Sequence, residues 1–164
     1  MTGKNKNGFA ITEEPIVSGR LRYTIYKKGI PIEQVEDNNL IVNGPRLRLA
    51  RLIAGDKSLF NSGQLISGLH IDKIAVGTSG NVTTVDDTEI TEAFAKPVDR
   101  FDYPEINKTR FFWRILESEA NGKAIKEFGL LTVDGTLFAR RFRAVAINKE
   151  SDISIDGEWT ITFG

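Results

Sequence analysis

Segments in which every second residue is apolar recur along this chain, and a period of two is the pattern of a β-strand with one buried face. Leu21, Tyr23 and Ile25 form the first such set. The Lys-Gly pair at residues 28–29 then interrupts the pattern and predicts a hairpin. Because Pro31 has no backbone N–H, we expect the second strand of this hairpin at a sheet edge.

The last third of the chain carries the strongest strand pattern. Residues 106–119, 123–133 and 136–147 are three predicted strands, and Asn-Gly at 121–122 and Asp-Gly at 134–135 are hairpin signals between them. A turn is expected within 152–157, before a final strand in which Trp159, Ile161 and Phe163 alternate with polar residues. We therefore expect three sequential strands to form a meander that a fourth strand closes.

One helix is predicted, from Pro45 to Ala54. Asn43 is suited to cap it, proline is tolerated in the first helical turn, and Gly55 follows the last apolar residue. Together these elements predict a mainly β fold, an antiparallel β-sandwich or partly closed barrel with one short α-helix.

The composition of the chain excludes several classes of functional site and partner. The chain has 164 residues, a formal net charge of zero, no cysteine and a single histidine, His70. Thiolate sites, cysteine nucleophiles and all-histidine metal sites are therefore excluded within one chain, and a nucleic-acid binder would carry a basic excess. No apolar run reaches the length of about 20 residues that spans a bilayer. We expect neither a cofactor nor a metal, and no nucleic-acid or membrane partner.

The polar N-terminal segment, residues 1–15, differs from the single β-rich domain expected over residues 16–164. Its large apolar side chains are Phe9 and Ile11. Such a segment is either a frayed terminus or an arm that orders on a neighbouring subunit. In the second case Phe9 and Ile11 are its anchors.

Two catalytic or metal-binding interpretations are weak. Residues 152–157 imitate the start of a calcium loop, but Phe163 stands where the loop requires a bidentate glutamate. Asp86, Asp87, Asp99 and Asp102 could act as a hydrolase pair only if two of them faced each other at a defined separation. We therefore expect no enzyme.

Aromatic residues exceed what one sheet face requires, which predicts either a two-sided core or an interface with another chain. Phe112 and Trp113 are the interface candidates among them. Arg140, Arg141 and Arg143 are further candidates, and Arg141 is expected to face opposite to the other two. The alternative is a carbohydrate-binding sandwich in which an exposed Trp113 or Trp159 stacks on sugars.

Two stretches resemble structural proteins of tailed-phage virions, particularly tail, baseplate and tail-fibre-associated components. The first joins Asn39–Asn43 to the predicted helix, then to the strand His70–Thr78 that ends in Val-Gly-Thr, and reaches Asp-Asp-Thr at 86–88. The second is Lys126–Arg140, which contains Glu-Phe-Gly-Leu and, after a hairpin, Asp-Gly-Thr-Leu-Phe-Ala. The resemblance implies a non-catalytic component of the tail, baseplate or fibre-attachment region. A neck or capsid-decoration role and a receptor-binding module stay open.

On this basis we expect a virion protein that assembles with other tail, baseplate or fibre proteins after synthesis in the host bacterial cytoplasm. We also expect a homo-oligomer, a trimer or a hexamer, in which the arm ties each copy to its neighbour. Near-zero net charge suits closely packed copies because mutual repulsion is small.

Overall fold

The computed structural model describes residues 2–4, 10–12, 17–54, 56, 60–61, 64–65 and 70–164. Nine strands of the described residues form one antiparallel sheet in the order β8-β7-β11-β12-β4-β3-β13-β10-β9. Their bounds, with that of the helix, are β3 (Val17–Lys27), β4 (Ile30–Ile41), α1 (Asn43–Ile53), β7 (Ile71–Gly77), β8 (Phe94–Pro97), β9 (Arg100–Asp102), β10 (Lys108–Ile115), β11 (Ala124–Thr132), β12 (Leu137–Asn148) and β13 (Ile153–Phe163).

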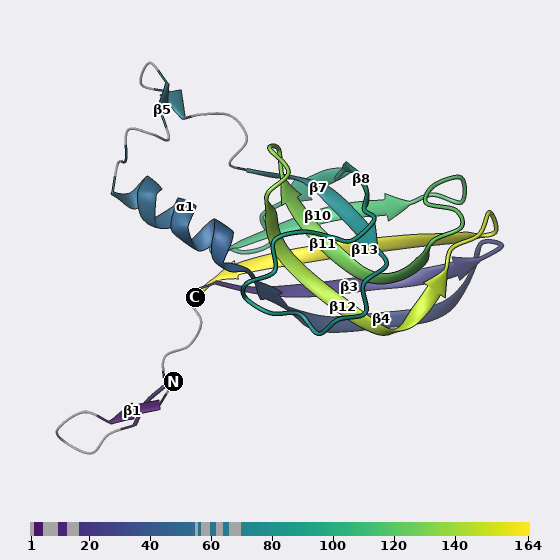
Figure 1. Cartoon of the computed structure of the whole chain (residues 1–164), viewed down its shortest axis with the longest axis horizontal. Coiled ribbons are helices and arrows are strands. Elements are labelled where there is room, and N and C mark those ends of the chain that lie inside the picture. The colour runs from purple at the N-terminus through teal and green to yellow at the C-terminus, as the bar shows by residue number, and fades with distance from the viewer. Residues whose placement is uncertain are drawn as a thin grey trace.

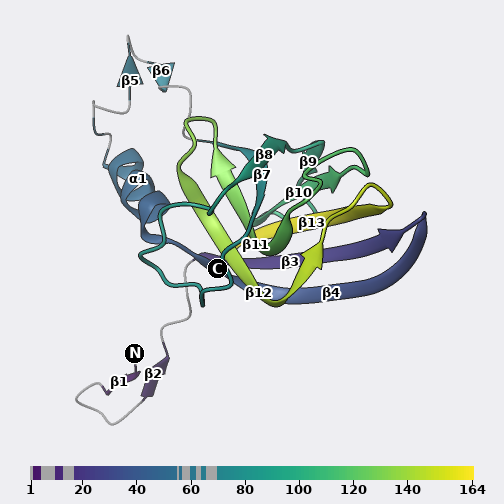
Figure 2. The same ribbon diagram turned by 45° about the vertical axis from the view of Figure 1, so that its right-hand side comes forward.

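The sheet curls into a half-barrel around its core, as Figure 1 and Figure 2 show. Its two end strands, β8 and β9, are joined by residues 98–99, which bridge the two ends. The Val98 N–H donates to the Asp72 carbonyl of β7, and the Asp99 N–H donates to the Phe112 carbonyl of β10, both at 2.8 Å. The expectation of a mainly β, partly closed barrel with one short helix is confirmed.

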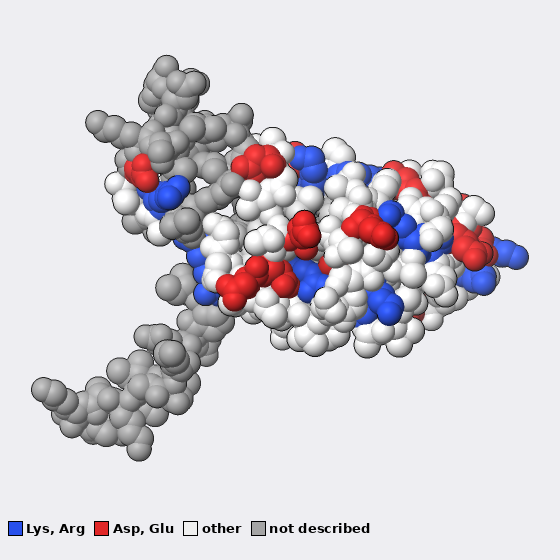
Figure 3. Space-filling view, viewed as in Figure 1, with Lys and Arg blue, Asp and Glu red and all other residues white. Residues whose placement is uncertain are grey.

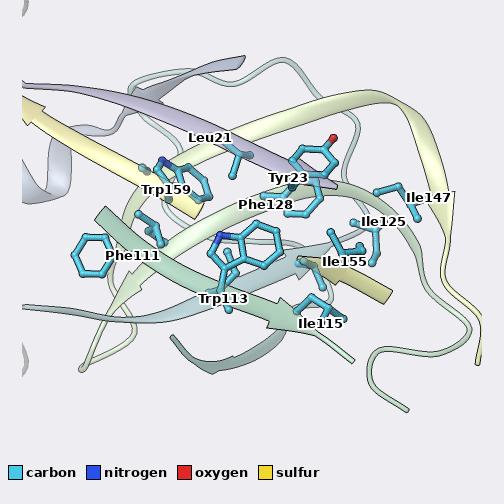
Figure 4. Packing of buried hydrophobic residues seen from close by; sticks show 14 of the residues in the cluster. Leu21, Tyr23, Phe111, Trp113, Ile115, Ile125, Phe128, Ile147, Ile155 and Trp159 are labelled. Carbon is cyan, nitrogen blue, oxygen red and sulfur yellow. The ribbon is translucent and has the colours of Figure 1, made fainter. Parts of the chain in front are cut away.

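The core fills the concave side of the sheet, and the alternating residues of β3 contribute to it as expected. Leu21, Tyr23 and Ile25 are all at most 3% exposed. The Phe128 ring lies 4.7 Å from that of Tyr23 and 5.7 Å from that of Trp113, measured between ring centroids. Figure 4 shows these rings meeting between strands that are distant in sequence.

The sequence predicts that Gly157 ends a turn, but this residue lies in the middle of β13. It pairs with Trp113 of β10 on one side and Tyr23 of β3 on the other. A Cβ at this position would lie 2.2 Å from Cζ2 of the Trp113 indole. The glycine therefore leaves room for the indole.

The Lys28-Gly29 and Asp134-Gly135 hairpins are confirmed: β3 pairs with β4, and β11 with β12. Lys28 and Gly29 both have positive φ, as a type I′ hairpin turn requires. The predicted Asn121-Gly122 hairpin is wrong. Residues 121–122 do form a turn, but β10 pairs with β9 and β13, and β11 pairs with β7 and β12.

The helix is present at the predicted place, but its start differs. Val42 occupies the N-cap position, without a side-chain cap, and the helix begins at Asn43. The Asn43 amide instead donates to Asp86 Oδ1 at 3.1 Å. Gly55, expected to end the helix, lies outside the described residues. Within the described ranges, no helix is long and apolar enough to cross a membrane.

Four short strands form two further sheets. β1 (Thr2–Lys4) pairs with β2 (Ala10–Thr12), and β5 (Phe60–Asn61) pairs with β6 (Gln64–Leu65). Phe9 lies outside the described residues. Ile11 is in β2, although its side chain is not described.

Candidate functional site

The segment between β7 and β8, residues 78–93, crosses the outer face of β11 and β12, and we call it the strap. In Figure 1 it is the teal coil that runs in front of these strands. The Glu127 carboxylate of β11 holds both of its ends, because Oε1 accepts hydrogen bonds from the backbone N–H of Ser79 at 3.0 Å and of Thr91 at 2.8 Å. In the middle of the strap, the Thr83 hydroxyl accepts a bond from the Phe142 N–H at 3.2 Å.

Arg140 of β12 completes this attachment. Its Nε donates to Glu127 Oε2 at 2.7 Å, and its Nη1 donates to Asp87 Oδ2 at 2.9 Å and to the Asn81 carbonyl at 3.1 Å. The side chains of Arg140 and Glu127 are 4% and 1% exposed. A buried charge is tolerable only when it is paired and hydrogen-bonded, and both conditions are met here.

The electrostatics of Asp87 fit the same role. Burial alone would raise the pKa of Asp87, but bonds from the Thr84 backbone and hydroxyl and from Arg140 outweigh it and hold this pKa below its ordinary value. Asp87 is thus kept as the anion that Arg140 requires.

A small apolar core lies beneath the strap. Ile90 packs with the buried side chains of Val42, Ala75 and Leu137. A Cβ on Gly129 would lie 2.6 Å from Cδ1 of Ile90, so the glycine admits the isoleucine against the sheet. The strap is therefore fixed both by charge and by packing.

The strap brings together two stretches of the chain that are distant in the sequence. Val76-Gly77-Thr78 lead into the strap and Asp86–Thr88 lie within it, whereas Glu127, Gly129 and Arg140 come from residues 126–140. Arg140, an interface candidate from the sequence, lies at this internal junction and is 3% exposed. It therefore presents no surface to another chain.

A gap in backbone pairing separates β4 from β12. β4 pairs with β3 over residues 30–39, but with β12 only at Leu40 and Ile41. The prediction that this strand lies at a sheet edge is wrong, because β4 is an interior strand; Pro31 itself lies in the part of β4 that has no backbone partner on the β12 side. On the opposite side of the gap β12 bulges: two residues along β11, from 125 to 127, correspond to five along β12, from 142 to 147.

Side-chain ion pairs span this gap where backbone bonds do not. Arg143 donates to both oxygens of Glu33, at 2.9 and 2.7 Å, and its Nη1 also donates to the Tyr23 hydroxyl at 2.9 Å. Arg141 pairs with Asp37. Arg141 faces opposite to Arg140, as expected, but Arg143 shares the face of Arg141, so that part of the prediction is wrong.

The charged groups in the gap change one another's pKa values. The hydrogen bond from Arg143 holds the pKa of Glu33 below its ordinary value, and the same bond to Glu33 raises the pKa of Arg143. Burial raises the pKa of Tyr23, so this hydroxyl stays protonated. Each guanidinium has its own carboxylate, and the gap is neutral overall.

A cavity of about 310 Å³ opens in the gap. Its floor is formed by Tyr23 and Phe128, and its walls by Val35, Phe142 and Val145 together with the two ion pairs. Volumes of 300–1,000 Å³ with mostly apolar walls and few polar groups are typical of binding cavities. The gap is therefore a candidate binding site; a larger cavity of about 470 Å³, lined in part by the charged side chains of Arg114, Glu117 and Asp156, lies elsewhere among the described residues.

The remaining interface candidates separate by sheet face. Trp113 is 2% exposed and lies in the core, so the expectation that it meets another chain is not supported by its position. Phe112, on the outer face, lies between two guanidinium groups, 3.5 Å from Arg100 and 4.8 Å from Arg110. Arg110 also pairs with both oxygens of Asp102.

Sequence reasoning missed an exposed group at β9, where Phe101 pairs with Phe111 of β10. Phe101, Tyr103 and Ile106 are 56%, 70% and 106% exposed, respectively. The rings of Phe101 and Tyr103 meet edge to face at 5.8 Å. We call these three residues the edge patch, because Phe101 belongs to β9, the last strand of the sheet. The aromatic pair in Phe-Asp-Tyr, two residues apart, was the available sequence signal.

The acidic residues of the hydrolase interpretation are divided between elements. Asp86 and Asp87 lie in the strap, Asp102 is in β9 with Arg110 as its partner, and Asp99 precedes β9. Over the part of the chain that the structure describes, no group of three or more histidine or acidic side chains could hold a metal ion. Figure 3 shows acidic and basic side chains interspersed over the visible face.

Searches of protein-family models, of curated proteins and of solved structures found no match to this chain.

Proposed function

We propose that this chain is a structural subunit of a tailed-phage virion, in the tail, baseplate or fibre-attachment region, and that it acts by protein–protein assembly. The edge patch is the observation that carries the proposal. Phe101 and Tyr103 are exposed in edge-to-face contact at the end of the sheet, and Ile106, three residues beyond Tyr103, is exposed as well. Tyrosine, phenylalanine and arginine are enriched at protein interfaces, whereas exposed aromatic clusters are unusual on monomers.

The rigidity of the strap region supports the proposal. A subunit that transmits contacts between neighbours needs fixed outer faces, and the Glu127–Arg140–Asp87 network holds the strap against β11 and β12. The residues of this network also belong to the stretches that resemble phage components. Under this proposal those stretches fix the shape of the subunit, while the edge patch and the N-terminal arm make the contacts.

The carbohydrate-binding alternative loses its main support. It required an exposed tryptophan, but Trp113 and Trp159, the two tryptophans of the chain, are 2% and 0% exposed. We therefore do not propose a sugar-stacking surface.

The proposal is tested by the absolute mass of the full chain, measured by light scattering after size exclusion over a range of concentrations. We expect a trimer or a hexamer. Replacing Tyr103→Ser and Ile106→Ser together should lower the mass at equal concentration, because the apolar contact is lost. Val82→Ser is the matched control, since Val82 is 68% exposed but lies on the strap. A native chain that is monomeric at every concentration contradicts self-assembly, and equal masses for the double variant and the control exclude the edge patch.

A further inference from the structure

The cavity between β4 and β12 has donors that no group of the described chain satisfies. Arg141 Nε is buried and has no hydrogen-bond partner. The Tyr23 hydroxyl accepts a bond from Arg143, which leaves its own hydrogen available to an acceptor. An unpaired buried donor is costly, so an occupant that brings carbonyl oxygens into the cavity would be stabilised there.

The edge of β4 offers backbone groups of the same kind. Its residues 30–39 pair with β3 on one side only, and Ile32, 58% exposed, and Val145, 70% exposed, stand on the two sides of the gap. An unpaired strand edge is a template for another extended segment. Since the ion pairs leave the gap neutral, a neutral segment with alternating apolar residues fits best.

We propose that the gap receives residues 8–12 (Gly-Phe-Ala-Ile-Thr) of a neighbouring copy, with the Phe9 ring in the cavity. This segment is uncharged, and its apolar residues Phe9 and Ile11 are two positions apart. Ala10–Thr12 is already a strand, in a two-stranded sheet of three residue pairs. Such a sheet is marginal alone and gains stability by lying on a larger one.

The size of the cavity agrees with this occupant. A cavity of about 150 Å³ is large enough for benzene. The 310 Å³ between β4 and β12 therefore admit a phenyl ring and part of the backbone that carries it.

The length of the arm favours a neighbouring copy over the same chain. Tyr23 lies six residues beyond Val17, about 20 Å along β3 at 3.3 Å per residue. Phe9 lies eight residues before Val17, which allows about 27 Å when fully extended. Only two residues would remain to reverse the chain and cross β4, so the arm of the same copy is too short.

Because the chain has no cysteine, disulfide trapping tests the contact directly in the full-length protein. A tagged Phe9→Cys variant is mixed with an untagged Val145→Cys variant under mild oxidation. We expect the mixed disulfide dimer, separated by mass, at a yield several times that of the control mixture of Phe9→Cys with Val82→Cys. Val82 and Val145 are 68% and 70% exposed, so accessibility is closely matched.

Two further measurements test whether Phe9 anchors the contact and whether the arm binds a neighbouring copy. Phe9→Ala should raise the dissociation constant of self-association at least about tenfold, as for a buried aromatic anchor. The double variant Phe9→Cys/Val145→Cys should form disulfides between chains; a bond within one chain would overturn the assignment to a neighbour. Equal trapping by Val145 and Val82 would overturn the site itself.

This inference rests on the proposed function, but the two fail differently. If the native chain oligomerises and no specific Phe9–Val145 disulfide forms, assembly stands and the cavity is not the receptor of the arm. If the native chain is monomeric and nothing is trapped, both are wrong.

Discussion

Replacing Glu127 by glutamine tests whether the buried network holds the strap. Glutamine keeps the shape of the side chain and an oxygen for the Ser79 and Thr91 N–H groups. It places an NH₂ group against Arg140 Nε, however, so a hydrogen bond at 2.7 Å becomes a contact between two donors. Breaking one partner of a buried ion pair costs about 3–5 kcal/mol. Because Arg140 keeps Asp87 as a second carboxylate, we expect about 3 kcal/mol, the lower end of that range.

The assay is equilibrium unfolding in denaturant at one fixed protein concentration, because self-association would change the apparent stability. Arg140→Met and the double variant complete a thermodynamic cycle. We expect a coupling energy of about 2 kcal/mol, within the range for side chains in one network. Arg114→Met is the control, since Arg114 pairs with Asp156 at the surface and should cost less than about 1 kcal/mol.

Hydrogen exchange provides the second measurement. In Glu127→Gln, the amides of Ser79 and Thr91 should exchange faster than in the native chain, while those of β3 and β13 stay protected, because the strap opens before the barrel. A loss of stability below about 1 kcal/mol, with unchanged exchange at both amides, would refute the reasoning.

Three further predictions concern the barrel and its pH dependence. Gly157→Ala should cost about 1–3 kcal/mol of unfolding free energy, because its Cβ meets the Trp113 indole, and adding Trp113→Phe should recover part of this loss in the same denaturation experiment. Lys149→Met should cost about 2 kcal/mol of unfolding free energy, because Lys149 is 1% exposed and its ammonium donates to Asn121 and to two carbonyls that would lose their partner; an unchanged denaturation midpoint would contradict this. Burial alone would raise the pKa of Glu119, but hydrogen bonds from the Leu116 N–H and from Lys96 outweigh it and lower this pKa below 4.5. The ionised Glu119 carboxylate therefore stabilises the fold fully above pH 4.5, and this stabilisation is lost as the pH falls through the lowered pKa. Lys96→Met should flatten the fall of thermal midpoint with acid, and an unchanged slope would count against the assignment.

The local elements could be predicted because their signals lie within a few residues. The alternation in β3 and the positive-φ Lys28-Gly29 pair of its turn are fixed by side-chain period and backbone sterics, which need no information from the rest of the chain. The partner of each strand is a different matter. Asn121-Gly122 makes a turn as expected, but Arg114 then pairs across the sheet with Asp156, 42 residues away. A strand with apolar residues on both faces, such as β10, does not indicate which neighbour it joins.

The same two-faced pattern explains the error at Trp113. Phe111, Trp113 and Ile115 share one face, as the alternation predicts, but the sequence of β10 does not say whether that face or the face of Phe112 points inward. The decision comes from β13, where Gly157 opposite Trp113 leaves the space that the indole fills. A glycine within an alternating strand indicates a close approach by another group, and here it would have corrected the predicted turn as well.

Arg140 shows what a charged residue within an apolar run implies. It follows Leu137, Phe138 and Ala139, all at most 9% exposed, and Glu127 directly precedes the buried Phe128. Neither residue can reach bulk water from such a position, so each requires an opposite charge inside the protein. One buried acid and one buried base on adjacent strands satisfy this requirement only by facing each other, and the backbone amides of the strap then fill the remaining positions around the carboxylate. The Asp134-Gly135 hairpin predicts that β11 and β12 are neighbours. Once this is known, the sequence predicts that Glu127 and Arg140 form an internal ion pair.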